Sequence, residues 1–416
     1  MELKSVDDYI AAKLTHSIHT SERRSFRGCR RRHNWVFRDF YYPTVTPKPL
    51  EFGIAAHKGF EVMYDPAGWQ DRESAAAASL VAFKQTVEAQ RAAYRKKHGE
   101  LSQEEEQDYN ERVALGLGML KFYGKKFLPY ETLTPIKVEI KFEVQIKHSD
   151  GRELWCNCLS CFNRYAGWLA QQSKQAEEEF RALGEAHGRL KWKGLPVTYG
   201  GRIDVLFVDE YGQVWIGDWK TAAQITVEGK DFYLQLDDQI TSYCWALWLL
   251  GLDVAGFLYM EVKKGFPEEP EPLKRVYRGC LYSTSKSNDY DYATYVKTVE
   301  ENDPTGYQNG LYDNFIEWLR TEGPVYHQRH QISRSEDELR IAGDNIFEEA
   351  ADIVDPNLRI YPSPGRFSCN FCAFQEPCLA ANRGDDVQSL LNVMYEKRRY
   401  HYWEDKEPST EGKGGE

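Results

Sequence analysis

The strongest constraint on the fold of this chain is a stretch in which two apolar runs flank a turn and each carries a carboxylate. It spans residues 199–220 and runs YGGRIDVLFVDEYGQVWIGDWK. Both runs are rich in β-branched and aromatic residues, which favour strands, and Gly212 between them suits a tight turn. The stretch therefore predicts a β-hairpin with Asp204 on its first strand and Asp218 on its second.

Three charged side chains are expected to meet on this hairpin. Lys220 follows Asp218 by two residues, so the alternation of a strand places both side chains on one face. Together with Asp204 they bring two carboxylates and one ammonium among apolar neighbours. Because burying unpaired charge is costly, a purely structural strand rarely carries such a group. The pattern indicates a metal site.

Two further segments carry polar residues at helical spacing. The segment GIAAHKGFEVMY places His57 and Glu61 four residues apart on one helix face. After the hairpin, the predicted helix DFYLQLDDQITSYCWALWLLG places Gln239 and Tyr243 one turn apart. The plain alternatives are a structural histidine and a core helix with a chance polar pair, and the packing against the hairpin decides between them.

The rest of the pattern predicts a mixed α/β organisation without internal repeats. The predicted strand 138–148 carries Glu139 and Glu143, which we assign to a solvated strand face rather than to the site. The other predicted elements are helices over 71–98, 103–127 and near 289–300, 308–320 and 335–353, and strands over 256–264 and 276–284.

Residues 21–42, SERRSFRGCRRRHNWVFRDFYY, interleave arginines with aromatic residues. Arginines for phosphates and aromatic faces for bases are typical of a surface that binds single-stranded nucleic acid. The alternative is an amphipathic helix with solvated arginines and an aromatic stripe in the core, and the two interpretations are compatible. The residues concerned are Arg23, Arg24, Arg27, Arg30, Arg31, Arg32, Trp35, Phe37, Tyr41 and Tyr42.

Three of the nine cysteines lie near the end of the chain with the spacing C-x2-C-x5-C: Cys369, Cys372 and Cys378. In a cytosolic protein such a cluster favours metal ligation over disulfides. Three thiolates leave one ligand position unfilled, and the isolated Cys29 is the best-placed candidate by composition. Four thiolates suit zinc or an iron–sulfur cluster, and the spacing does not separate the two.

A second trio, Cys156, Cys158 and Cys161, opens a charged insertion over residues 155–194. Zinc with a fourth ligand such as His187 is one interpretation of this trio. Because no second paired motif accompanies it, we favour buried or loop thiols within an insertion.

The net charge and the lengths of the apolar runs bear on whether the chain binds nucleic acid or a membrane. Its 416 residues carry a formal net charge of −11, which argues against a surface that coats nucleic acid throughout but allows a local basic groove. The sequence has no apolar run near the roughly 20 residues that cross a bilayer, and its first residues lack a signal-peptide core. We therefore expect a cytoplasmic protein with no membrane partner and a disordered acidic tail over 404–416.

In chain order, these motifs resemble the PD-(D/E)xK nuclease superfamily and, within it, the RecB-type exonuclease branch. The motifs are G-x3-H at Gly53–His57, the aspartate Asp204, D-W-K at Asp218–Lys220 and Q-x3-Y at Gln239–Tyr243. The N-terminal cysteine and the C-terminal trio are similar to those of the iron–sulfur members of that branch, which include CRISPR-adaptation nucleases and phage-encoded relatives. The chain departs from the superfamily pattern in having no proline before Asp204.

The resemblance implies an α/β, restriction-endonuclease-like fold with a mixed central sheet flanked by helices, helical insertions and a terminal subdomain bound by a cluster. It implies Mg²⁺ or Mn²⁺ on His57, Asp204, Asp218 and the Trp219 carbonyl. It further implies that Lys220 is catalytic beside Asp204 and Asp218, and that Gln239 and Tyr243 line the site and contact DNA. A 4Fe-4S cluster, in preference to zinc, would bind Cys29, Cys369, Cys372 and Cys378.

The expected activity is that of a metal-dependent DNA exonuclease acting on single strands or ends in recombination, repair or phage DNA processing. One alternative is a non-cleaving DNA-end-binding subunit with a protein partner in a recombination or spacer-acquisition complex, and another is a redox-sensing iron–sulfur protein. The expected divisions are a basic segment 1–52, a nuclease core 53–360 with insertions over about 71–130 and 155–194, and a cluster-binding segment 361–403.

Overall fold

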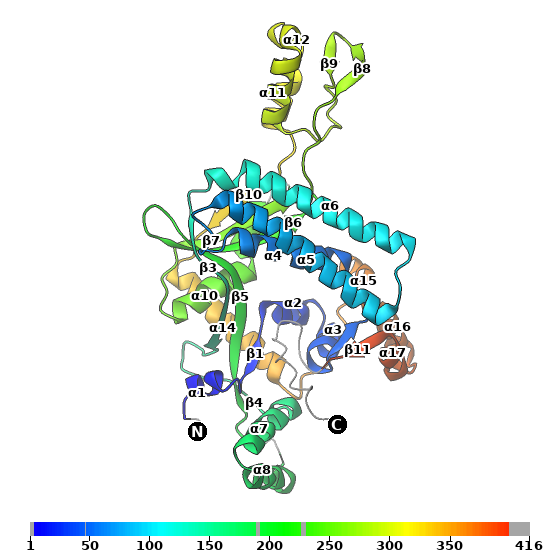
Figure 1. Cartoon of the computed structure of the whole chain (residues 1–416). Helices are drawn as coiled ribbons and strands as arrows, with labels where there is room; N and C mark the ends of the chain where they lie inside the picture. Colours follow the sequence, from blue (N-terminus) through cyan, green and yellow to red (C-terminus); the bar gives the residue numbers. More distant parts are fainter. Residues whose placement is uncertain (1–3, 46, 189–191, 226–229, 399–416) are drawn as a thin grey trace, which may run out of the picture.

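A seven-stranded mixed sheet forms the centre of the computed structural model, which describes residues 4–45, 47–188, 192–225 and 230–398 (Figure 1). The path through the sheet is β1-β5-β6-β7-β10, and β3 and β4 also pair with β5. These strands are β1 (His16–Ile18), β3 (Thr134–Gln145), β4 (Trp155–Cys156), β5 (Leu195–Val208), β6 (Val214–Ala222), β7 (Gly256–Lys263) and β10 (His327–Ile332). The acidic tail predicted over 404–416 lies outside the described residues.

The predicted hairpin is confirmed as β5 and β6, which pair antiparallel. Gly212 in the turn has a φ of 80°, a left-handed conformation that glycine adopts without strain. The carboxylate of Asp209 accepts hydrogen bonds from the N–H groups of Tyr211 and Gln213 and so closes the turn. Because β7 pairs parallel with the other edge of β6, the strand that carries Asp218 lies inside the sheet.

Helices cover both faces of the sheet (Figure 1). One face is covered by α4 (Lys48–Met63), α5 (Arg72–His98) and α6 (Gln103–Lys126), and the other by α2 (Thr20–Gly28), α10 (Asp238–Leu249) and α14 (Glu336–Val354). The first core contains Val205 and Trp219 of the hairpin, and the second contains Leu206 and Ile216. Because side chains alternate along a strand, this one hairpin contributes residues to both cores. The fold class predicted from the sequence is confirmed.

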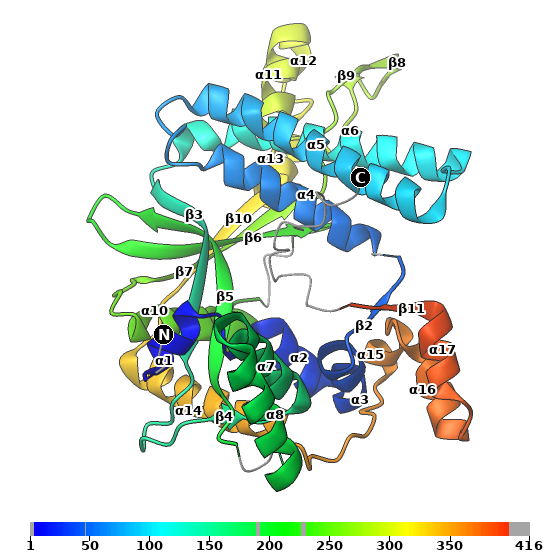
Figure 2. The ribbon, with the colours of Figure 1, turned by 60° about the horizontal axis from the view of Figure 1, so that its bottom comes forward.

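Segments near the two ends of the described chain, residues 29–43 and 366–397, lie side by side (Figure 2). The short strands β2 (Tyr41–Pro43) and β11 (Tyr395–Lys397) pair antiparallel. Around them lie α3 (Arg30–His33), α15 (Arg366–Asn370), α16 (Gln375–Arg383) and α17 (Val387–Met394). A small separate core joins Trp35 and Tyr41 from one end to Phe374, Leu391 and Tyr395 from the other.

The predicted single strand over 276–284 is wrong. The residues instead form a hairpin of β8 (Pro272–Tyr277) and β9 (Cys280–Tyr282), outside the main sheet. Arg278 and Gly279 have φ values of 52° and 83°, and two consecutive left-handed residues reverse the chain between the strands. This hairpin and α11 (Tyr292–Asn302), α12 (Pro304–Gln308) and α13 (Asp313–Thr321) share a small core of their own at the top of Figure 1.

The remaining elements include α1 (Val6–Ala11), α7 (Leu159–Gln172), α8 (Lys174–His187) and α9 (Lys230–Leu236). The insertion predicted over 155–194 is therefore mainly the helical pair α7 and α8, which lies at the bottom of Figure 1. Within the described ranges, the helices are all too short or too polar to cross a membrane.

Candidate active site

A cavity of about 860 Å³ lies over the centre of the sheet, beside α4 and the first turn of α10. Its lining includes six of the residues singled out in the sequence: His57, Asp204, Asp218, Lys220, Gln239 and Tyr243. Four different elements supply them, namely α4, β5, β6 and α10. The fold therefore brings together residues that the sequence separates widely.

Asp204 is the meeting point of helix α4 and the hairpin. Its Oδ2 lies 3.1 Å from Nδ1 of His57 and accepts a hydrogen bond of 2.9 Å from the backbone N–H of Trp219. Burial would raise the pKa of the Asp204 carboxyl, but His57, Lys220 and the N–H of Trp219 together lower it below its ordinary value. Burial alone would lower the pKa of His57, and Asp204 reverses this to a net rise. Each group thus favours the charged form of the other.

Asp218 carries the second buried carboxylate. Its Oδ2 lies 2.6 Å from Nζ of Lys220, and its Oδ1 accepts a hydrogen bond of 3.1 Å from Nε2 of Gln239. Burial raises the pKa of Asp218 above the ordinary value of aspartate, against the opposing effect of Lys220. Burial alone would lower the pKa of Lys220, but Asp218 and Asp204 raise it, so the side chain is an ammonium at neutral pH.

The side chains differ in how far they reach into the cavity. The side chains of His57 and Lys220 remain 32% and 35% exposed, whereas those of Asp204 and Asp218 are 11% and 5% exposed. The carboxylates therefore form the floor, and the imidazole and the ammonium stand where a ligand in the cavity can reach them. This is the same-face arrangement that the spacing of Asp218 and Lys220 predicts.

Helix α10 fixes the two remaining polar groups. Asp237, its N-cap, accepts hydrogen bonds from the backbone N–H groups of Gln239 and Ile240, which sets the first turn over the sheet. One turn later, Tyr243 packs edge-on against Phe142, with ring centroids 5.2 Å apart. Burial raises the pKa of Tyr243 well above its ordinary value, so its hydroxyl stays protonated and can donate.

Trp219 differs from the other predicted ligands because its side chain belongs to the core. Its indole stacks on Phe60 with centroids 5.1 Å apart and packs beside Tyr64 on the opposite side of the strand from Asp218. The backbone of Trp219 contributes through its N–H bond to Asp204. Metal ligation by its carbonyl stays a prediction.

Glu139 and Glu143 line the cavity, although strand alternation favoured a solvated face for them. Glu139 has a left-handed φ of 50°, which breaks the regular alternation of β3 opposite Asp204. Its carboxylate pairs with Arg202 at 2.9 Å, and burial raises its pKa. Glu143 instead accepts a hydrogen bond from Thr15 at 2.5 Å. A backbone irregularity of this kind leaves no signal in the residue pattern.

The arginines of the basic segment serve mostly as internal partners. Arg23 is 1% exposed and pairs with Asp238 of α10 at 2.9 Å and with Glu349 of α14 at 2.6 Å. Trp35, Tyr41 and Tyr42 are likewise buried, as the core-stripe interpretation predicts. Arg24 differs from Arg23, because its side chain is 58% exposed and lines the cavity.

The residues of the cavity floor fit a divalent cation by their donor chemistry. Two carboxylates and one imidazole offer oxygen and nitrogen ligands of the kind that Mg²⁺ and Mn²⁺ accept. The short contact between His57 and Asp204 joins two of these prospective ligands. Without a cation, the buried negative charge is balanced by the neighbouring imidazole and ammonium.

The cysteines predicted to form a cluster all lie where the chain ends meet. Cys29 stands between α2 and α3, and Arg31 just beyond it donates hydrogen bonds to the carbonyl oxygen and Sγ of Cys378 at 3.3 and 3.4 Å. Burial raises the pKa of the Cys372 thiol, and Cys29 and Cys369 lie close enough to add to this rise. The fold thus brings Cys29 and Cys369 near Cys372, and ligation of one cluster by the four cysteines stays a prediction.

The comparisons with known proteins agree with this site. Residues 20–379, which include every lining residue discussed above, match the family model of the PD-(D/E)XK nuclease superfamily. Members of this superfamily are nucleases that use divalent metal ions. Among curated proteins, no match to the chain was found. With most of its length matched and with Asp204, Asp218 and Lys220 gathered on one hairpin, the chain belongs to the PD-(D/E)XK nuclease superfamily.

Proposed function

We propose that the chain is a metal-dependent DNA exonuclease of the RecB-type branch, acting in the cytoplasm on single strands or ends during recombination, repair or phage DNA processing. The observation that carries this proposal is the convergence of His57, Asp204, Asp218, Lys220 and Gln239 on the floor of one cavity. A binding platform without catalysis has no need of a lysine held 2.6 Å from a buried carboxylate.

The residues divide the work of phosphodiester hydrolysis. Asp204, Asp218 and His57 would hold Mg²⁺ or Mn²⁺, which supplies Lewis-acid activation and a low pKa for water. Lys220, charged and partly exposed, orients the attacking water and offsets the charge that develops on the phosphate. Gln239 donates to Asp218 and so fixes the direction of that carboxylate. The neutral hydroxyl of Tyr243 is available to donate to DNA.

Cationic side chains at the cavity wall offer contacts to the DNA backbone. Arg24, Lys58 and Arg202 all line the cavity, and their side chains are 58%, 46% and 56% exposed. Each lies near one acidic partner but keeps much of its side chain in solvent, where a phosphate can replace that partner. This local basic wall is compatible with the net negative charge of the chain.

The preference for single strands is supported by two exposed aromatic residues on α9, the helix before α10. Phe232 and Tyr233 on α9 are 76% and 58% exposed, in the segment just before Gln239. Asp237, Arg24 and Lys220 are among the charges that act on the pKa of Tyr233, which places this ring near the site. Bases freed from a duplex can stack on such rings, whereas the bases of an intact duplex cannot.

A 4Fe-4S cluster on Cys29, Cys369, Cys372 and Cys378 completes the proposal. Backbone N–H groups donate to Sγ of Cys369 and Cys372 at 3.4 Å each, and such bonds stabilise cluster thiolates. The cluster would tie the two chain ends together.

The test compares linear and circular substrates. Protein purified without oxygen is incubated with Mn²⁺ and with linear single-stranded, linear double-stranded and circular single-stranded DNA. We expect loss of the linear single strand from one labelled end while the circle survives. Cutting of the circle would show an endonuclease, and binding without cleavage of any substrate would favour the DNA-end-binding subunit.

A further inference from the structure

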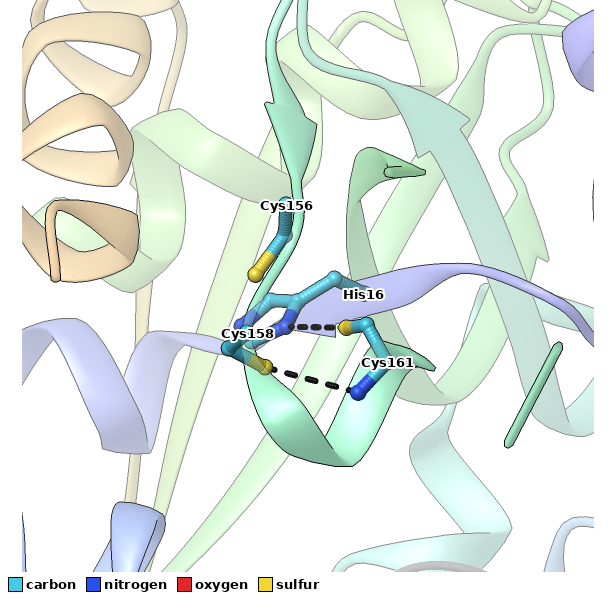
Figure 3. Close-up of side chains that lie close together, drawn as sticks. All are labelled: His16, Cys156, Cys158 and Cys161. Carbon is cyan, nitrogen blue, oxygen red and sulfur yellow. Dashed lines mark hydrogen bonds between the residues drawn. The ribbon is translucent and has the colours of Figure 1, made fainter. Parts of the chain in front are cut away.

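A group of four metal-ligating side chains lies outside the active site, beside the first residues of β5 (Figure 3). It consists of His16, Cys156, Cys158 and Cys161. Cys156 ends β4 and pairs with Leu195 of β5, and His16 begins β1 and pairs with Val197 of the same strand. Cys158 is the N-cap of α7, and Cys161 lies in the first turn of that helix.

The ligand atoms of the four residues lie within 4.8 Å of one another. Nδ1 of His16 is 3.3 Å from Sγ of Cys161, and Figure 3 shows the sulfur of Cys156 turned toward the same imidazole. Tetrahedral zinc, with Zn–S of about 2.3 Å and Zn–N of about 2.0 Å, needs ligand atoms roughly 3.5–3.8 Å apart. A small contraction of the observed group reaches this geometry.

Two features of the backbone, at Cys161 and at Gly194, hold the group in place. The N–H of Cys161 donates to Sγ of Cys158 at 3.4 Å, which holds that sulfur beside the first turn of α7. Gly194 has a φ of 105°, and a Cβ there would lie 2.4 Å from the carbonyl oxygen of Cys156. The glycine thus permits the close approach that seats Cys156. Cys156 and Cys161 are only 2% and 1% exposed.

We propose that His16, Cys156, Cys158 and Cys161 bind a structural zinc ion. Three thiolates and one imidazole form a donor set that binds zinc in preference to Mg²⁺ or Mn²⁺. Because the protein fills all four positions, the site is closed and leaves no position for substrate. His187, the fourth ligand considered from the sequence, has a side chain outside the described ones, and His16 takes that place.

The zinc ion would connect β1, β4 and α7, which also contact one another in the core of the sheet. Ser17 of β1 and His19, just after that strand, line the active cavity. Binding zinc at the first residue of β1 therefore holds one wall of the cavity and the insertion together.

The test measures metal content in the full-length protein and does not depend on nuclease activity. We expect one zinc per chain by mass spectrometry, separate from the iron of the proposed cluster. His16→Ala and Cys158→Ala each lose that zinc and keep the iron. His16→Cys retains the zinc. Cys280 is buried in the separate small core of the hairpin β8–β9 and helices α11–α13, and Cys280→Ala changes the content of neither metal.

X-ray absorption at the zinc edge of the native protein keeps the proposal testable if the variants do not fold. Three sulfur scatterers near 2.3 Å and one nitrogen near 2.0 Å would support it. Absence of zinc, iron in its place, or a shell of four sulfurs that is lost in Cys372→Ser would overturn it. None of these outcomes bears on cleavage, so the site and the proposed nuclease activity stand or fall separately.

Discussion

Burial disfavours the charged forms of both Lys220 and Asp218, and the attraction between the two charges offsets this cost. The raised pKa of Lys220 keeps it cationic, and burial raises the pKa of Asp218. A spacing of two residues in a strand is enough to create this pair, which explains why the sequence predicted it. Glu139 was not predictable in the same way, because its left-handed φ changes where its carboxylate lies.

At this scale we expect Lys220→Ala to lower the rate of DNA cleavage by about 10²- to 10³-fold, since it removes a preorganised charge at the reacting phosphate. The chain still folds, because Asp218 can take up a proton once the ammonium is gone. Single-turnover rates with circular dichroism check both points. Lys274→Ala, on exposed β8, is the matched control, and near-normal cleavage by Lys220→Ala would remove lysine from the mechanism.

At the scale of elements, an ion pair connects β10 to the loop before β3. Arg329 donates to both carboxylate oxygens of Glu131, which also accepts hydrogen bonds from Tyr64 and the backbone of Leu133. Burial alone would raise the pKa of Glu131, but Arg329 and the other donors lower it below 4.5. The ionised Glu131 therefore stabilises the folded state above pH 4.5. This stabilisation is lost as the pH falls through the lower pKa that Glu131 has in the folded state.

We accordingly expect Glu131→Gln to destabilise the fold by about 3 kcal/mol at neutral pH, because it leaves Arg329 without its charge partner. The difference from the wild type should shrink as the pH falls below 4.5. Urea unfolding at several pH values measures this. Glu317→Gln, in an exposed pair on α13, should leave stability unchanged. A constant difference at all pH values would contradict the linkage.

Helix α9 is the element that distinguishes single from double strands in the proposed function. Removal of the Phe232 or Tyr233 ring should weaken single-strand binding by about 1–3 kcal/mol per stacked base and leave duplex binding nearly unchanged. Fluorescence anisotropy on a background of Asp218→Asn, which blocks cleavage, gives the affinities. Tyr211→Ala is the control, since Tyr211 is 80% exposed at the hairpin turn away from the cavity. Equal loss for both DNA forms would contradict a stacking role.

At the scale of the whole molecule, residues 29–43 and 366–397 are joined by a short strand pair, a small aromatic core and a few hydrogen bonds such as those of Arg31 to Cys378 and Asn382. Cys372→Ser should therefore lose iron and the brown colour and lower the melting temperature. Hydrogen exchange should rise in Tyr41–Pro43 and Tyr395–Lys397. Unchanged iron and unchanged protection in both strands would show that the C-terminal trio does not hold the cluster.

The sequence predicted the parts of the fold that depend on local pattern. The hairpin, the long helices α5 and α6 and the helix carrying Gln239 were found because apolar periodicity and a turn glycine define them. Strands β1, β2 and β11 have three residues each, too few for a periodic signal. The partnership of His16 with a distant cysteine trio arises from pairing with β5, and no spacing rule connects such separated segments.

The measurement that tests the central claim most directly is cleavage of linear single-stranded DNA under control of the metal ion. Wild-type protein and the variants Asp204→Asn and Asp218→Asn are compared in EDTA and again after excess Mn²⁺ is added. The account predicts that EDTA stops cleavage by the wild type, that Mn²⁺ restores it, and that neither variant cleaves in either condition. Cleavage that persists in EDTA, or in both variants, would contradict a metal-dependent nuclease site on this hairpin.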